Sequence, residues 1–332
     1  MELILRYHLY DQKNGQKRLY KKTAALGVLL VTGAANVFPD KGSKNMKKQI
    51  IYKTRGHRAD IGPIEIHRLV SNNYTTHVGH FIFLDYISPF MIPSRQLNTD
   101  AAHPHRGIAT LTYILNGEAK HYDSRGHKGT VYSGGVQWMK AANGILHNEA
   151  IGPDPKIGGK LMHGFQFWMN LPASEKSKNP DYMAIQNEEL PLIPLENNAG
   201  TLKVVVGEYG GQSSKIPTYA QQYLYHIKLQ AGKSFTLPTV NELEYAVFLP
   251  QQDLTINETS YHLGDLIGFD DKGGDIEFVN HLDTEAEFIF FGGEKYTEPF
   301  VAQGPFVMST KEEIQLAYND YMSGKYGKIV YN

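Results

Sequence analysis

Cysteine is absent from this chain of 332 residues. Disulfide bonds, thiolate zinc sites, iron–sulfur clusters and cysteine nucleophiles are therefore excluded, so any metal must bind imidazole, carboxylate or water. The sequence also lacks an apolar run of the roughly 18–20 residues that cross a bilayer as a helix. With a formal net charge of −1 at pH 7, the chain has no basic excess of the kind that general nucleic-acid or anionic-membrane binders show.

Residues that favour strands and residues typical of tight turns are frequent in the sequence. The chain holds 32 Gly, 21 Tyr and 15 Phe, and short runs rich in Val, Ile and Thr alternate with turn residues. The run from Thr110 to Leu115 ends at Asn116-Gly117, which is a strong hairpin signal. This pattern predicts an all-β sandwich or barrel fold. One helix is expected after Thr310, which can form a capping box with Glu313.

The first 46 residues differ from the rest. Basic residues, an apolar run from Ala24 to Val31 and the small residues that follow resemble a secretory signal over residues 17–38. A hairpin over residues 3–10 with a turn at Asn14-Gly15, a start codon assigned too far upstream or a flexible extension are the alternatives. We expect a cytoplasmic protein, and a periplasmic one if residues 17–38 act as a signal peptide.

The length suffices for two domains with separate cores. Repeated Pro and Asn residues after Asp181 predict a linker, and a second series of strands begins at Lys203. The predicted divisions are an extension over residues 1–46, a metal-binding domain over 47–180, a linker over 181–200, and a second domain without a metal site over 201–332.

Two pairs of polar residues have the spacing of metal ligands. His103 and His105 stand two apart, as do His147 and Glu149. On a strand, residues two apart project from the same face, so two such pairs on neighbouring strands can surround one ion. Isolated pairs of this kind are also common among surface and turn residues. Three imidazoles and one carboxylate with open positions suit Fe(II), with Mn, Ni, Cu and Zn as alternatives.

The remaining histidines are expected to have no role at the metal. His121 and His127 flank a polar turn and are expected to face solvent.

Several segments resemble the signature of the pirin family, in the same order and at matching spacing. They extend over roughly residues 50 to 327: His103 to Gly107, Thr110 to Glu118, His121 to Ser124, Val136 to Met139, Gly144 to Glu149, Met162 to Pro172, Phe291 to Glu294, and Gly304 to Met308. Two positions depart from the family pattern, because Ala109 stands where Glu is frequent and Gly135 where Asp is common.

The resemblance implies two stacked cupin barrels, with a short C-terminal helix and one mononuclear metal in the first barrel. The family's ligands fall on His103, His105, His147 and Glu149, the residues that the spacing selects. Gln166 matches a glutamine that lines the family's metal pocket. We assign Gln166 and Trp138 to a substrate pocket, with packing between strands as the alternative for both.

The resemblance also implies an activity. Some pirins open flavonols with dioxygen in the manner of quercetin 2,3-dioxygenase, with Glu149 as the catalytic base. The expected partners are then a small aromatic substrate and dioxygen, without nucleic acid or a membrane span. Two other hypotheses remain, which are a metal- and redox-dependent regulator that acts through protein partners and a non-catalytic binder of a small metabolite.

Overall fold

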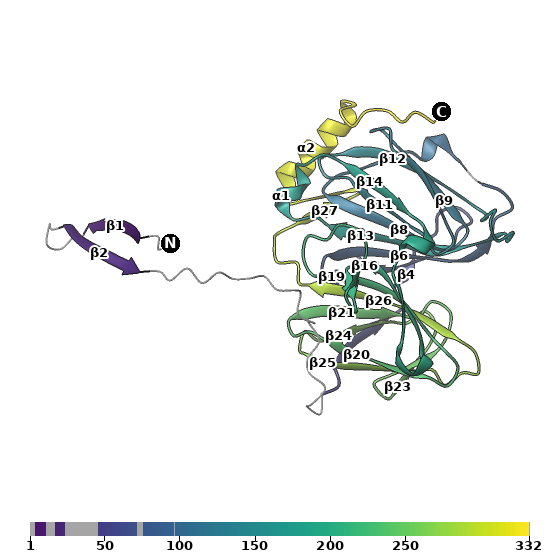
Figure 1. Cartoon of the computed structure of the whole chain (residues 1–332). Coiled ribbons are helices and arrows are strands. Elements are labelled where there is room, and N and C mark those ends of the chain that lie inside the picture. The colour runs from purple at the N-terminus through teal and green to yellow at the C-terminus, as the bar shows by residue number, and fades with distance from the viewer. Residues whose placement is uncertain (1–3, 11–16, 24–45, 72–75, 96, 332) are drawn as a thin grey trace. The chain divides into compact units, whose positions relative to one another are not determined.

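The computed structural model describes residues 4–10, 17–23, 46–71, 76–95 and 97–331. Strands make up most of the described chain, as Figure 1 shows, so the expected all-β fold is confirmed. The strands between residues 50 and 294 form two barrels of similar design, each with one long sheet and one short sheet.

The first barrel contains the strands β4 to β14. Their bounds are β4 (His57–Arg58), β5 (Ile66–Val70), β6 (Phe81–Met91), β7 (His103–His105), β8 (Ile108–Asn116), β9 (Glu118–Asp123), β10 (Lys128–Tyr132), β11 (Val136–Lys140), β12 (Ile145–Gly152), β13 (Leu161–Asn170) and β14 (Asp181–Ile185). Within the described residues, seven strands form the sheet β14-β11-β8-β13-β6-β5-β4, and four form the sheet β10-β9-β12-β7.

The second barrel repeats this plan. Its strands are β3 (Ile50–Thr54), β15 (Leu192–Pro194), β16 (Gly200–Val206), β19 (Gln222–Leu229), β20 (Ser234–Thr239), β21 (Leu243–Phe248), β22 (Leu254–Ile256), β23 (Thr259–Tyr261), β24 (Leu266–Phe269), β25 (Gly274–Val279) and β26 (Ala286–Glu294). In the part of the chain that is described, the sheet orders are β15-β16-β19-β26-β21-β24-β3 and β20-β25-β22-β23.

Shorter elements complete the structure. The strand pairs are β1 (Ile4–Tyr10) with β2 (Lys17–Thr23), β17 (Glu208–Tyr209) with β18 (Gln212–Ser213), and β27 (Val301–Gln303) with β28 (Phe306–Met308). The helices are α1 (Ala173–Lys176) and α2 (Lys311–Met322), and the 3-10 turns are η1 (Thr99–Ala101), η2 (Asn187–Glu189) and η3 (Glu196–Asn198). Neither α1 nor α2 has the length and apolar character that crossing a bilayer requires.

The two barrels share a hydrophobic core between their long sheets. Phe81 and Phe167 of the first barrel pack edge to face on Phe291 of the second, with both ring centroids 5.6 Å from that of Phe291. All three rings are fully buried. Burial of each such ring stabilises the fold by about 1.5–3 kcal/mol, so this core holds the two barrels together.

The predicted C-terminal helix is confirmed as α2. The Thr310 hydroxyl accepts a hydrogen bond from the backbone of Glu313, and the Glu313 side chain completes the capping box. Ile314 and Ala317 of this helix are buried. Asp320 is buried as well, because it forms an ion pair of 2.8 Å with Arg106, which follows β7. The helix therefore packs on the first barrel (Figure 1).

Strand pairing crosses the divisions expected from the sequence. Strand β3 lies before the first barrel in the chain, yet it pairs with β24 at the edge of the second barrel. The expected linker contributes β14 to one long sheet and β15 to the other. The limits of the domains therefore stay a prediction.

The N-terminal segment contains the hairpin that one alternative predicted. Strands β1 and β2 pair in antiparallel fashion, with Tyr7 opposite Tyr20. The part of the signal-like segment after Thr23 lies outside the described residues.

Candidate metal centre

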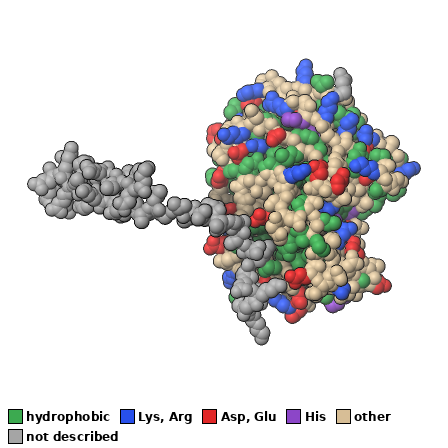
Figure 2. All heavy atoms as spheres, in the orientation of Figure 1, with side chains coloured by type: hydrophobic (Ala, Val, Ile, Leu, Met, Phe, Trp, Pro, Cys, Tyr) green, Lys and Arg blue, Asp and Glu red, His purple; other side chains and the backbone are tan. Residues whose placement is uncertain are grey.

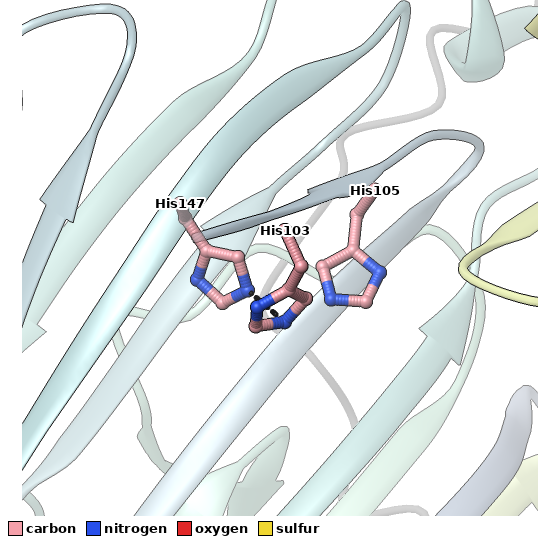
Figure 3. Close-up of side chains that lie close together, drawn as sticks. All are labelled: His103, His105 and His147. Atoms are coloured by element: carbon pink, nitrogen blue, oxygen red, sulfur yellow. Dashed lines mark hydrogen bonds between the residues drawn. The ribbon is translucent and has the colours of Figure 1, made fainter. Parts of the chain in front are cut away.

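Three histidines meet on one face of the short sheet of the first barrel. Strands β7 and β12 pair in antiparallel fashion, with His103 opposite His147 and His105 opposite Ile145. The rings of His103, His105 and His147 converge, as Figure 3 shows. One nitrogen from each lies within 4.8 Å of the others, and the Nε2 atoms of His103 and His147 are 3.0 Å apart.

Backbone carbonyls orient two of these rings. His103 Nδ1 lies 3.0 Å from the oxygen of Ala101, and His105 Nδ1 lies 3.1 Å from the oxygen of Pro305. A carbonyl oxygen only accepts, so in the neutral rings Nδ1 carries the proton and Nε2 keeps its lone pair. A backbone partner on the far nitrogen is typical of metal-binding histidines.

Burial keeps two of the three rings uncharged. Burial, followed by the charge of His103, lowers the pKa of His105 from 6.5 to about 3. Burial also lowers the pKa of His147 well below its usual value, and the neighbouring imidazoles add to this effect. Because a metal binds only the neutral imidazole, the two residues are ready to bind near pH 7 without losing a proton first.

The geometry fits a single ion. Two imidazole nitrogens at right angles around an ion, each with a bond of ~2.1 Å, would be ~3.0 Å apart, the separation that His103 and His147 have. His147 Nδ1 is buried and has no hydrogen-bond partner in the described structure. His103 is exposed whereas His105 and His147 are buried, so a ligand from solvent can approach on the side of His103.

Glu149 lies on β12 but outside this group of three. Its carboxylate oxygen is 2.7 Å from the Thr112 hydroxyl of β8, in the opposite sheet. The amide oxygen of Gln166 lies 2.7 Å from the same hydroxyl. A hydroxyl has one proton to donate, and the charged acceptor makes the stronger bond. Thr112 therefore donates to Glu149, and the Gln166 amide must turn its NH2 toward the hydroxyl.

The long sheet forms a polar floor opposite the histidines. Gln137, Thr112, Gln166 and Asp85 stand side by side on four adjacent strands. Trp168 lies two residues beyond Gln166 on β13. Its ring meets His105 edge to face at 5.0 Å.

The structure does not bring Trp138 to this floor. Trp138 follows Gln137 on β11, so its side chain projects from the opposite face of the sheet. It is 1% exposed and belongs to the hydrophobic core that the barrels share. Of the two residues assigned to a substrate pocket, Gln166 lies at the floor and Trp138 lies behind it.

The expectation for His121 was wrong. His121 is 1% exposed, its ring stacks on Tyr182 at 4.1 Å, and it lies 5.6 Å from the ring of His147. Its Nε2 is 2.9 Å from a carboxylate oxygen of Asp123, which also contacts His127. No local pattern around His121 predicts this burial, because Tyr182 comes from the distant strand β14. His127 is half-buried.

Comparison with known proteins agrees with this architecture. Residues 64–169 match the Pirin family model, and residues 224–327 match the model of the pirin C-terminal cupin domain. A Pseudomonas aeruginosa protein, named provisionally as a quercetin 2,3-dioxygenase, is 33% identical over 77% of this chain and 89% of its own length. Human pirin is 32% identical over 68% of this chain and 77% of its own.

A solved structure is similar over most of the fold. The crystal structure of quercetin 2,3-dioxygenase from Acinetobacter baumannii superposes with a TM-score of 0.76 and 28% identity. The match covers 85% of this chain and 99% of the other. Family models on both barrels, together with relatives of this identity and coverage, show that the chain belongs to the pirin family.

Proposed function

We propose that this protein is a metal-dependent dioxygenase that opens flavonols or a related small aromatic substrate. His103, His105 and His147 would hold one divalent ion in the first barrel, with Glu149 as the fourth ligand or close beside it. Fe(II) is the preferred ion, with Mn, Ni, Cu and Zn as alternatives. The observation that carries the proposal is the convergence of three imidazoles, two of which direct Nδ1 to backbone carbonyls.

The bound ion would supply Lewis acidity, which acidifies a hydroxyl group placed next to it. The Glu149 carboxylate would accept the proton of the flavonol 3-hydroxyl at the oxygen that Thr112 now contacts. In the overall reaction both oxygen atoms of dioxygen enter the product and one ring carbon leaves as carbon monoxide. Electrons balance without an external reductant.

Aromatic side chains would orient a flat substrate. Trp168 stacks on Phe83 with ring centroids 4.3 Å apart, beside His105. Gln166 would offer its amide to a hydroxyl of the substrate from the same floor. The exposed side of His103 leaves an approach from solvent.

The test begins with metal analysis of the purified protein, followed by incubation with quercetin in air and without oxygen. About one ion per chain, together with oxygen-dependent loss of the flavonol absorbance band, supports the proposal. Glu149→Gln removes the base while it keeps the shape of the side chain, so its rate should fall at least a hundredfold. His262→Ala changes a histidine whose side chain is 62% exposed on the second barrel, and it is the matched control.

The regulatory hypothesis predicts a different outcome. The relative human pirin shares the family without an activity in its name. On the face shown in Figure 2, basic and acidic side chains are interspersed, in line with a net charge of −1. A filled site with no oxygen-dependent change in quercetin would favour a regulator or a binder. Capture of a protein partner that depends on the redox state of the metal would then identify the regulator.

A further inference from the structure

A second pocket lies at the junction of the two barrels. It has a volume of about 460 Å³, and its walls come from β16, β19 and the segment that connects the barrels. This volume falls in the range of roughly 300–1,000 Å³ that small-molecule sites occupy. None of the residues that line it belongs to the candidate metal centre.

Strand register gathers basic side chains on one wall of this pocket. Lys203 of β16 stands opposite His226 of β19, and Thr201 stands opposite Lys228. Residues two apart on a strand share a face, so all four side chains project from the same side of the sheet. Leu190 and Leu192 form an apolar wall beside them.

Two of the basic groups already have partners. His226 contacts the Tyr113 hydroxyl at 2.8 Å through Nδ1 and Glu287 at 3.0 Å through Nε2. The Lys228 ammonium lies 3.4 Å from carboxylate oxygens of both Glu285 and Glu287. The side chains of His226 and Lys228 are therefore already paired with carboxylates and are not expected to bind an anionic ligand.

Lys203 differs from both. Its ammonium donates to the side-chain oxygen of Asn187, and within the described part of the chain it forms no ion pair with a carboxylate. Burial, followed by the charge of Lys228, lowers the pKa of Lys203 from 10.5 to about 8. Lys203 is partly buried, and the charge of Glu287 offsets only part of the cost of burying its ammonium, so an anion that binds there removes more of that cost.

We propose that this pocket binds a small monocarboxylate with an apolar body. The carboxylate would pair with Lys203 and accept from the Thr201 hydroxyl, while the apolar body would contact Leu190 and Leu192. Because Lys203 is the one lysine of this wall without an ion pair in the described structure, a ligand with a single negative charge fits best. The exposed carboxylate of Glu188 at the rim of the pocket would repel a second negative charge on the ligand.

Titration of the full-length, metal-loaded protein with benzoate, followed by calorimetry, tests this proposal. Saturable binding at millimolar concentrations is expected, weakened at least tenfold in both Lys203→Met and Lys203→Gln. Lys215→Met is the matched control, because Lys215 is exposed and paired with Glu189 at 2.8 Å, and it should bind as the wild type does. Two neutral substitutions are used because a folding defect in one variant could otherwise be mistaken for a loss of benzoate binding.

Several outcomes would overturn the proposal. One is the absence of benzoate binding to the wild-type protein. Another is equal binding by the Lys203 variants, which would place benzoate elsewhere, the metal included. A third is inorganic phosphate that binds more tightly than benzoate, which would refute the monocarboxylate class. Thermal unfolding without benzoate gives a further readout, because Lys203→Met removes an unmatched charge and should not lower the melting temperature.

Discussion

Replacement of His147 by alanine should remove the metal without unfolding the protein. His147 is one of the three converging imidazoles, and its Nε2 lies 3.0 Å from that of His103. With two imidazoles left, the ion would have too few nitrogen ligands to compete with water. The barrel itself does not depend on this ring, because the hydrogen bonds of β12 to β7 and β9 are made by the backbone.

The expected change in stability follows from two opposing effects. Truncation of a buried side chain typically costs about 0.5–3 kcal/mol. However, the substitution also removes a buried nitrogen that has no partner, which costs the native state about 1–3 kcal/mol. The metal-free variant should therefore lie within about 2 kcal/mol of the metal-free wild type, a difference of roughly 4 °C or less in melting temperature.

Thermal unfolding with and without metal separates these effects. At a metal concentration one hundred times Kd, binding stabilises the folded protein by about 2.7 kcal/mol, which corresponds to roughly 5 °C for a chain of this size. The wild type and His262→Ala should show this shift, and His147→Ala should not. A variant that keeps the shift, or that loses its β circular dichroism together with its metal, would refute the reasoning.

Three further predictions concern the same barrel. Thr112→Val removes the hydroxyl that contacts Glu149, so the rate of quercetin loss should fall about tenfold while metal analysis shows full occupancy. Gly107→Ala should abolish folding as judged by circular dichroism, because a Cβ there would lie 1.8 Å from a carbonyl oxygen of β28, whereas Gly126→Ala meets no atom within 4 Å and should fold. The pKa of about 3 for buried His105 means that the unfolded chain takes up its proton first as pH falls below 6.5, so His105 alone should make the metal-free protein roughly 2 kcal/mol less stable to urea at pH 5 than at pH 7. Burial lowers the pKa of His147 as well, so the measured loss should exceed this figure.

Local sequence patterns were sufficient to predict the class of fold. The capping box at Thr310 begins α2 as predicted. The hairpin predicted at Asn116-Gly117 was wrong, because β8 pairs with β11 and β13 in the long sheet whereas β9 pairs with β10 and β12 in the short sheet. The turn at Gly117 therefore leads the chain from one sheet to the other. The position of β3 could not be predicted in this way. Thr54 pairs with Leu266, and nothing in the pattern around either residue encodes a partner so far away in the chain.

Some features of the candidate site could likewise be predicted from local sequence, and others depend on distant strands. The spacing of His103, His105 and His147 sufficed because a strand carries alternate residues on one face, and pairing of β7 with β12 then brings the rings together. The same rule places Glu149 on the same face of β12 as His147, but it does not predict the contact of Glu149 with Thr112 in the opposite sheet. The burial of His121 likewise depends on a strand that is distant in sequence.

The long sheet of the first barrel explains why the metal and the fold are separable. Its inner face carries polar residues such as Thr112 and Gln166, whose side chains contact each other at 2.7 Å. Its outer face carries Tyr113 and Phe165, which are fully buried in the core shared with the second barrel. The outer face thus shares its apolar packing with the second barrel, whereas the inner face carries the polar groups of the candidate site. A substitution on the inner face should therefore act mainly on chemistry, and one on the outer face mainly on stability.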